Sequence, residues 1–248
     1  MSFSFFIPIV AGILSGVLVD YLAITIPYSR LFRRPVCIDC DNDYSFKDYL
    51  LFRRCPSCSN STVVIRISLI AVYIISSLII WNGNQTVNLV VLKLLVLIYF
   101  GVICVIDIRY HAIFLGMNIF GLLLCLYSGS LLFGIESSLK GGAAGSTIFI
   151  LLYLFGIFVK KVRNAKSSSS EADDPVLGFA DIILAGVLGL LVGWPNIFTM
   201  ISWTVVLSGL FAGFFIIIKR IKLGAEEIYL PFAPFLIGGT IITFMIIL

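Results

Sequence analysis

Charged residues are scarce in this chain. Of its 248 residues, only 12% are Asp, Glu, Lys or Arg, 60% are hydrophobic, and the mean hydropathy is +1.11. A surface exposed to water needs more charge than this, so the composition excludes a soluble globular domain and predicts a polytopic membrane protein. The net charge of +4 resides in short connections between apolar runs, as expected where basic residues set membrane topology. We therefore expect the lipid bilayer as a partner and no nucleic acid.

Three other features are missing from the sequence. No internal repeat is evident. No Lys or Arg precedes the first apolar run, so we interpret that run as a retained helix rather than a cleaved signal sequence. No glycine-rich turn after a strand is visible, which argues against a soluble Rossmann-type methyltransferase domain.

The run 165–174, with four consecutive serines, is interpreted as a solvated loop.

Apolar runs long enough to cross a bilayer dominate what is present. A spanning helix takes about 20 residues, and shorter spans occur. The predicted fold is an all-α polytopic membrane protein of about eight transmembrane helices, over residues 5–26, 63–81, 88–106, 117–134, 141–159, 180–194, 197–218 and 230–248. We divide the chain into a first transmembrane helix (1–27), a polar cysteine-containing loop (28–62) and a transmembrane helical core (63–248).

The basic residues define the predicted orientation. Fifteen of the 17 fall in the odd-numbered connections, and only Lys93 and Lys140 fall at the opposite face. The positive-inside rule then places both termini outside the cytoplasm and the loop 28–62 inside it.

Two C-x-x-C pairs lie in that loop. Cys37-Ile-Asp-Cys40 and Cys55-Pro-Ser-Cys58 are separated by fourteen residues, a spacing that fits a structural four-thiolate zinc site. Two disulfides, a redox pair, or cysteines without a role are the alternatives, and a reducing cytoplasm disfavours structural disulfides. The remaining Cys104 and Cys125 lie in apolar helices and are interpreted as small buried hydrophobes.

Three of the thirteen acidic residues lie outside the loops: Asp20, Asp107 and Asp181. Asp107 follows one apolar run and Asp181 opens another, at the same predicted membrane face. A close pair of carboxylates shares one proton, which supplies an acid and a base for hydrolysis. Alternatively, Asp181 is a helix cap and Asp107 meets headgroups or Arg109.

Asp20 lies deeper in its apolar run. A polar contact between helices is the favoured interpretation. A third member of the carboxylate site and a protonated side chain bonded to backbone are the alternatives.

Several motifs in order resemble one family, the bacterial type IV prepilin peptidases, which are the leader peptidases of type IV pili and type II secretion. The resemblance spans nearly the whole chain. It rests on Gly16 to Pro27 before the paired C-x-x-C loop, the turn Ile106-Asp107-Ile108-Arg109, the element Gly178-Phe179-Ala180-Asp181, and the stretch Pro231-Phe232-Ala233-Pro234-Phe235-Leu236.

The resemblance implies an aspartic endopeptidase of the bacterial inner membrane with Asp107 and Asp181 as the catalytic pair. Its substrates would be prepilins or pseudopilins, cut on the cytoplasmic side of a glycine. Many members then methylate the new N-terminus, which implies S-adenosylmethionine as a second cofactor besides zinc.

The chain departs from the family pattern at several positions. Ala180 replaces the second glycine of G-x-G-D, and Phe114 and Leu115 stand where Pro and then Asp or Asn are usual. Asp20 and Thr25 occupy the usual Asn and Arg positions of the first helix.

Three alternative functions stay open. The first is a different intramembrane aspartyl protease: presenilin-like and preflagellin peptidases also use two aspartates, one of them in a G-x-G-D motif, but they lack the paired C-x-x-C loop. A carboxylate-based ion or proton-coupled transporter would place its acids near the midplane rather than at one interface. The third is a non-catalytic homologue that binds prepilins.

Overall fold

The structure is a computed structural model. It describes residues 3–27, 34–37, 40, 43, 45–51, 63–81, 86–112, 114–164, 178–221 and 231–247. Within these ranges the chain forms helices and no strand: α1 (Phe3–Thr25), α2 (Phe46–Leu50), α3 (Val63–Trp81), α4 (Val87–Tyr110), α5 (Leu115–Phe133), α6 (Ile135–Asn164), α7 (Phe179–Val192), α8 (Ile197–Ile221) and α9 (Ala233–Ile247). The predicted all-α class is confirmed.

Six of these helices, α1, α3, α4, α5, α6 and α8, are long and apolar enough to cross a bilayer. Two shorter apolar helices, α7 and α9, have 14 and 15 residues. Each coincides with one of the predicted runs, and α2 lies in the polar loop. The helices indicate a polytopic membrane protein, and eight as the number of spans stays a prediction.

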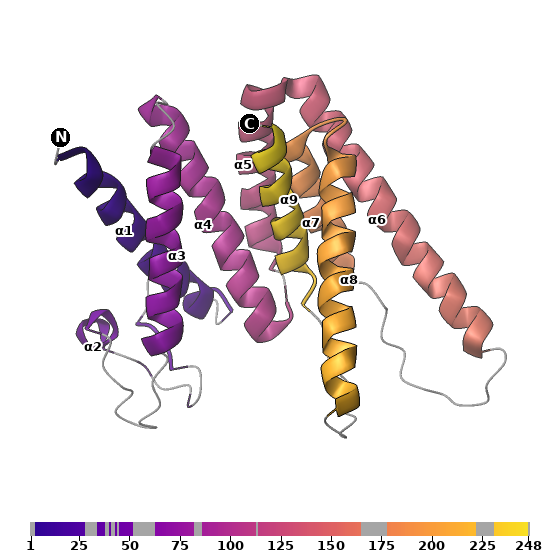
Figure 1. Ribbon diagram of the computed structural model, residues 1–248, viewed down its shortest axis with the longest axis horizontal. Coiled ribbons are helices and arrows are strands. Elements are labelled where there is room, and N and C mark those ends of the chain that lie inside the picture. Colours follow the sequence, from indigo (N-terminus) through magenta and orange to yellow (C-terminus); the bar gives the residue numbers. More distant parts are fainter. Residues whose placement is uncertain are drawn as a thin grey trace. The chain divides into compact units, whose positions relative to one another are not determined.

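The chain divides into two compact units, Met1–Arg109 and Tyr110–Leu248. Figure 1 shows the helices of each: α1 to α4 in the first unit and α5 to α9 in the second.

In the first unit, α1 and α3 pack so closely that their backbones meet. A Cβ added to Gly12 would lie 2.6 Å from the Ile74 Cα, and one added to Gly16 would lie 2.9 Å from the Ile70 Cα. Small residues permit this approach between apolar helices. The pairs 12–74 and 16–70 define an antiparallel register, and one turn further along it Asp20 lies opposite Arg66.

The helix α4 also contacts α3, because the Tyr73 hydroxyl donates to the Leu97 carbonyl over 2.8 Å. It continues four residues past the predicted end of its apolar run, so Asp107 and Arg109 lie inside its last turn. Loss of hydropathy marks the edge of a membrane span, whereas backbone hydrogen bonds extend beyond it. His111, with φ +49°, adopts the left-handed conformation common just after a helix.

The second unit is held by a similar small-residue contact. Gly141 and Gly145 of α6 face Gly189 and Ala185 of α7, so these helices are antiparallel with touching backbones. The Ser137 hydroxyl donates to the Trp194 carbonyl over 2.8 Å at one end of this contact. Gly134, with φ +83°, closes the one-residue connection from α5, which explains why α6 begins at Ile135.

Candidate functional site

Asp107 lies in the last turn of α4 and is 6% exposed. The three preceding turns are apolar and contribute buried residues such as Phe100, Ile103 and Ile106. Its helix therefore holds a carboxylate at one end of a long apolar segment, as the sequence predicts. A buried carboxylate in such a position needs a specific reason to persist, because desolvation disfavours its charge.

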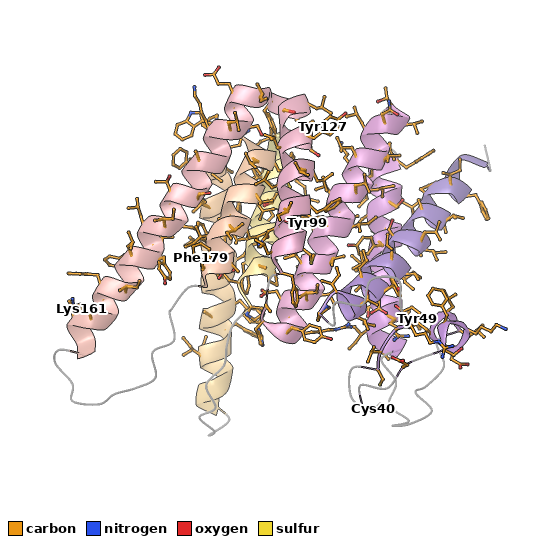
Figure 2. The ribbon with its side chains drawn as sticks, turned by 180° about the vertical axis from the view of Figure 1, so that it is seen from behind. Cys40, Tyr49, Tyr99, Tyr127, Lys161 and Phe179 are labelled. Carbon is orange, nitrogen blue, oxygen red and sulfur yellow. The ribbon has the colours of Figure 1, made fainter. Side chains whose placement is uncertain are left out.

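Asp181 occupies the first turn of α7. Its Oδ2 accepts a hydrogen bond from the Gly178 backbone N–H over 3.2 Å. Glycine suits position 178, because a Cβ there would come within 3.3 Å of that oxygen. The side chain, at the third position of the helix, thus satisfies the backbone N–H of the N-cap residue Gly178, and its negative charge lies favourably at the positive end of the helix dipole. Figure 2 marks this turn by Phe179, which is exposed.

Ala180 fits the first turn of α7 without distortion. It is helical, and the only non-glycine residue with positive φ among the described positions is His111. The methyl group of Ala180 therefore imposes no backbone strain here.

The two aspartates belong to different units, Asp107 to Met1–Arg109 and Asp181 to Tyr110–Leu248. The structure places each at the end of its own apolar helix. That they meet in one site stays a prediction.

The first C-x-x-C pair lies against the end of α1. Cys37 is buried in a small cluster with Ile24, Val36 and Tyr49, and Cys40 packs against the same cluster. Figure 2 shows Cys40 and Tyr49 at the same end of this unit. Cys55 and Cys58 lie outside the described residues, so the four-thiolate zinc site stays a prediction.

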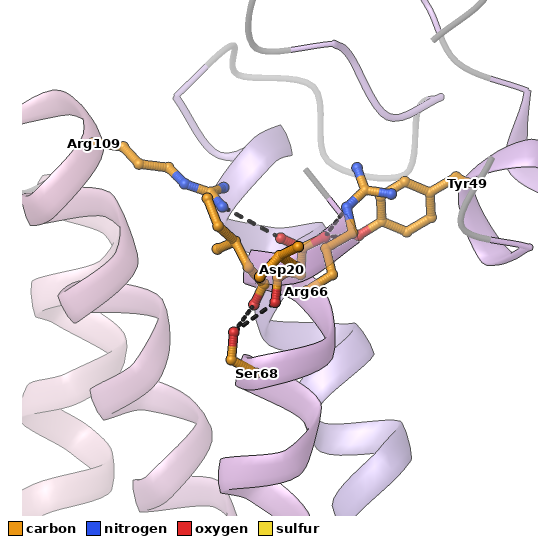
Figure 3. A network of polar contacts seen from close by, with 7 residues as sticks. Asp20, Tyr49, Arg66, Ser68 and Arg109 are labelled. Carbon is orange, nitrogen blue, oxygen red and sulfur yellow. Dashed lines mark hydrogen bonds and ion pairs between the residues drawn. The ribbon is translucent and has the colours of Figure 1, made fainter. Parts of the chain in front are cut away.

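A buried polar network in the first unit centres on Asp20, which is 3% exposed. The Tyr49 hydroxyl donates to its Oδ2 over 2.7 Å, and the Arg66 Nε lies 3.1 Å from the same oxygen. The Arg109 guanidinium lies 3.6 Å from Oδ1. Figure 3 shows these side chains converging from α1, α2, α3 and α4. The favoured interpretation of Asp20, a polar contact between helices, is confirmed.

Tyr49 is the least expected member of this network. Burial raises the pKa of its hydroxyl well above the ordinary 10.0, and the charge and hydrogen bond of Asp20 raise it further. The hydroxyl is therefore a permanent donor at physiological pH. The Arg66 guanidinium also stacks 4.3 Å from the centre of the Tyr49 ring, a cation–π contact.

Sequence reasoning did not single out Tyr49 or Arg66. The sequence holds one signal for Arg66. Gly12, Gly16 and Asp20 are spaced by four residues, which predicts that Asp20 lies on a close-packed helix face. A basic residue on the facing helix is then the expected partner of this carboxylate. Tyr49 carries no such signal, because its contact depends on how a polar loop folds back on the helices.

Comparison of the chain with models of protein families, with curated proteins and with solved structures gave no match.

Proposed function

We propose that the chain is a prepilin leader peptidase, an aspartic endopeptidase that removes the basic leader of prepilin-like proteins at the cytoplasmic face of the bacterial inner membrane. Asp107 and Asp181 are the proposed catalytic pair. The order and spacing of the motifs along the chain support this function. The multiple apolar helices suit an enzyme that receives a membrane-anchored substrate.

One observation carries the proposal: Asp107 is buried in the last turn of its helix. The carboxyl end of a helix carries partial negative charge, so an ionised aspartate there is opposed by the dipole as well as by desolvation. A catalytic role gives a reason for a carboxylate to be kept at this unfavourable position.

The chemistry follows from a shared proton. The ionised carboxylate accepts a proton from a water molecule while the water oxygen attacks the carbonyl carbon of the scissile peptide bond. The protonated carboxyl donates to the carbonyl oxygen, and a proton then passes to the leaving amine as the C–N bond breaks. The substrate helix in the bilayer would hold the scissile bond near the acids, so membrane geometry supplies the orientation.

For the loop 28–62 we propose a structural zinc ion held by Cys37, Cys40, Cys55 and Cys58. The packing of the first pair against Ile24 and Tyr49 supports this role, since it fixes two thiols at the base of the loop. Zinc would order a segment too short to bury a core of its own.

The decisive experiment incubates purified full-length protein with a synthetic prepilin that has a basic leader, a glycine at the cleavage position and a hydrophobic helix. Mass spectrometry reads the product. Asp107→Asn and Asp181→Asn should each lower the cleavage rate by about a thousandfold or more, because asparagine preserves shape but cannot exchange the proton. The exposed Glu136 of α6 provides a control, and Glu136→Gln should cleave at the wild-type rate.

Other outcomes separate the alternatives. A shortened product with both asparagine variants fully active would refute the catalytic pair. A prepilin that co-purifies with the wild-type protein and stays uncut would indicate a non-catalytic homologue, whereas a transporter would neither bind nor cut it. With S-adenosylmethionine added, the same spectrum reports whether the new N-terminus gains a methyl group.

A further inference from the structure

We propose that Asp20 is a positioning residue for Asp107, acting through Arg109. This inference rests on the proposed function. The supporting contacts all lie within the first unit, where Arg109 of α4 forms an ion pair with Asp20 of α1.

Arg109 and Asp107 share the last turn of α4. Each residue of an α-helix turns the chain by about 100°, so the two side chains leave the helix about 200° apart. An attraction that holds Arg109 toward α1 therefore fixes the rotation of this turn and directs Asp107 to the opposite face. The end of a helix frays easily without such a restraint.

Asp20 is itself held firmly. The close approach of α1 and α3 at Gly12 and Gly16 fixes the backbone one and two turns before it. Its Oδ2 accepts a hydrogen bond from the Tyr49 hydroxyl and forms an ion pair with Arg66, and its Oδ1 forms an ion pair with Arg109. A carboxylate immobilised in this way is a rigid anchor for the arginine of a neighbouring helix.

The same carboxylate also binds the cysteine loop. Tyr49 lies on α2, which falls in the sequence between the two C-x-x-C pairs. Docking of the loop and orientation of the last turn of α4 therefore depend on one side chain. A change in the loop reaches Asp107 through two contacts, Tyr49 to Asp20 and Asp20 to Arg109.

The test compares kcat and KM of the full-length protein, with the synthetic prepilin as substrate, for Asp20→Asn, Arg109→Gln and the double variant. We expect each single change to lower kcat by about 10- to 100-fold with KM nearly unchanged, since small misplacements of catalytic groups cost about this much. The double variant should be no slower than the slower of the two single variants, because both changes remove the same contact between Asp20 and Arg109.

Two further variants sharpen this test. Arg109→Lys should recover most of the rate, because a single nitrogen-to-oxygen contact needs a cation and not the guanidinium fork. Glu136→Gln removes an exposed ion pair of α6 and should leave kcat unchanged.

Hydrogen exchange supplies a readout besides activity. Asp20→Asn should raise exchange in residues 107–110 and in α2 while the middle of α3 stays protected. Exchange that rises uniformly over α1, α3 and α4 would mean general destabilisation and overturn the proposal. Unchanged kcat in Asp20→Asn, or single effects that multiply in the double variant, would also overturn it.

Failure of this inference is distinguishable from failure of the proposed function. If the wild-type protein cleaves, Asp107→Asn is inactive and Asp20→Asn is fully active, the function stands and the positioning role falls. If the wild-type protein does not cleave the prepilin, the proposed function falls, and the catalytic positioning role falls with it. Local exchange in Asp20→Asn then reports only on the structural link between Asp20 and Arg109.

Discussion

At the scale of single residues, Tyr49 gives a pH-dependent prediction. Its folded-state pKa lies above the ordinary value, so the unfolded protein loses this proton first as pH rises. The stabilising contribution is complete below about pH 10 and declines above it, by about 1.4 kcal/mol per pH unit. We expect Tyr49→Phe to cost about 1.5–3 kcal/mol at pH 7, the usual effect of removing a hydrogen bond to a charged group.

The measurement is thermal unfolding of the wild-type protein and the Tyr49→Phe variant in the same detergent between pH 7 and pH 11. The difference between their midpoints should be constant to about pH 10 and then shrink. A difference that grows with alkaline pH would contradict the assigned role of the hydroxyl.

The sequence predicts the contact of a single residue where the depth of its side chain in the membrane decides whether it needs a partner. Asp20 is deep in an apolar run, and burial of its charge requires partners, so a contact between helices could be predicted. Tyr49 is 29 residues away along the chain in a polar segment. No periodicity in the sequence indicates which loop side chain reaches the carboxylate.

At the scale of elements, the cysteine loop is predicted to depend on zinc. Cys37→Ser or Cys40→Ser should each lower the zinc content of the purified protein and raise proteolysis near α2, because a tetrahedral site loses one thiolate. Cys104→Ala, in an apolar helix, is the matched control and should retain the metal. Protein that lacks zinc in elemental analysis, yet keeps a protease-resistant loop, would contradict this prediction.

Hydropathy located the apolar helices but not their ends. The predicted run 88–106 stops where charge begins, whereas α4 continues to Tyr110 because its backbone hydrogen bonds persist past the apolar region. Similarly, α6 starts at Ile135 rather than 141, since one glycine makes the turn from α5. The short α2 was not predicted, because five residues in a polar loop carry no helical periodicity.

At the scale of the whole molecule, the positive-inside rule predicts the orientation of the chain. Lys140 and Lys161 are both exposed on α6 and are separated by about 32 Å along its axis, close to the thickness of the hydrocarbon core. In intact cells, a membrane-impermeant thiol reagent should label Lys140→Cys and spare Lys161→Cys until the membrane is permeabilised. The opposite labelling pattern would invert the topology and place Asp107 and Asp181 outside the cytoplasm.

Packing of the helices within each unit is the part of the fold that the sequence predicts least. In the structure, the glycines at 12, 16, 141 and 189 lie where two helix backbones touch. The glycines at 116, 209 and 213 do not, because a Cβ added to any of them would have no neighbouring atom within 4 Å among the described residues. Composition alone does not separate these two groups, because a close contact depends on the facing helix as well.

The central claim is that Asp107 and Asp181 form one site, and disulfide formation between cysteines at these positions tests it most directly. The chain would carry Asp107→Cys and Asp181→Cys, with Cys104→Ala to remove a competing thiol one turn away. Mild oxidation in membranes should join residues 107 and 181, which requires Cα atoms within about 7 Å. Ser137→Cys with Trp194→Cys is the positive control, since their backbones are hydrogen-bonded. A disulfide in the control pair and none between 107 and 181 would contradict the account.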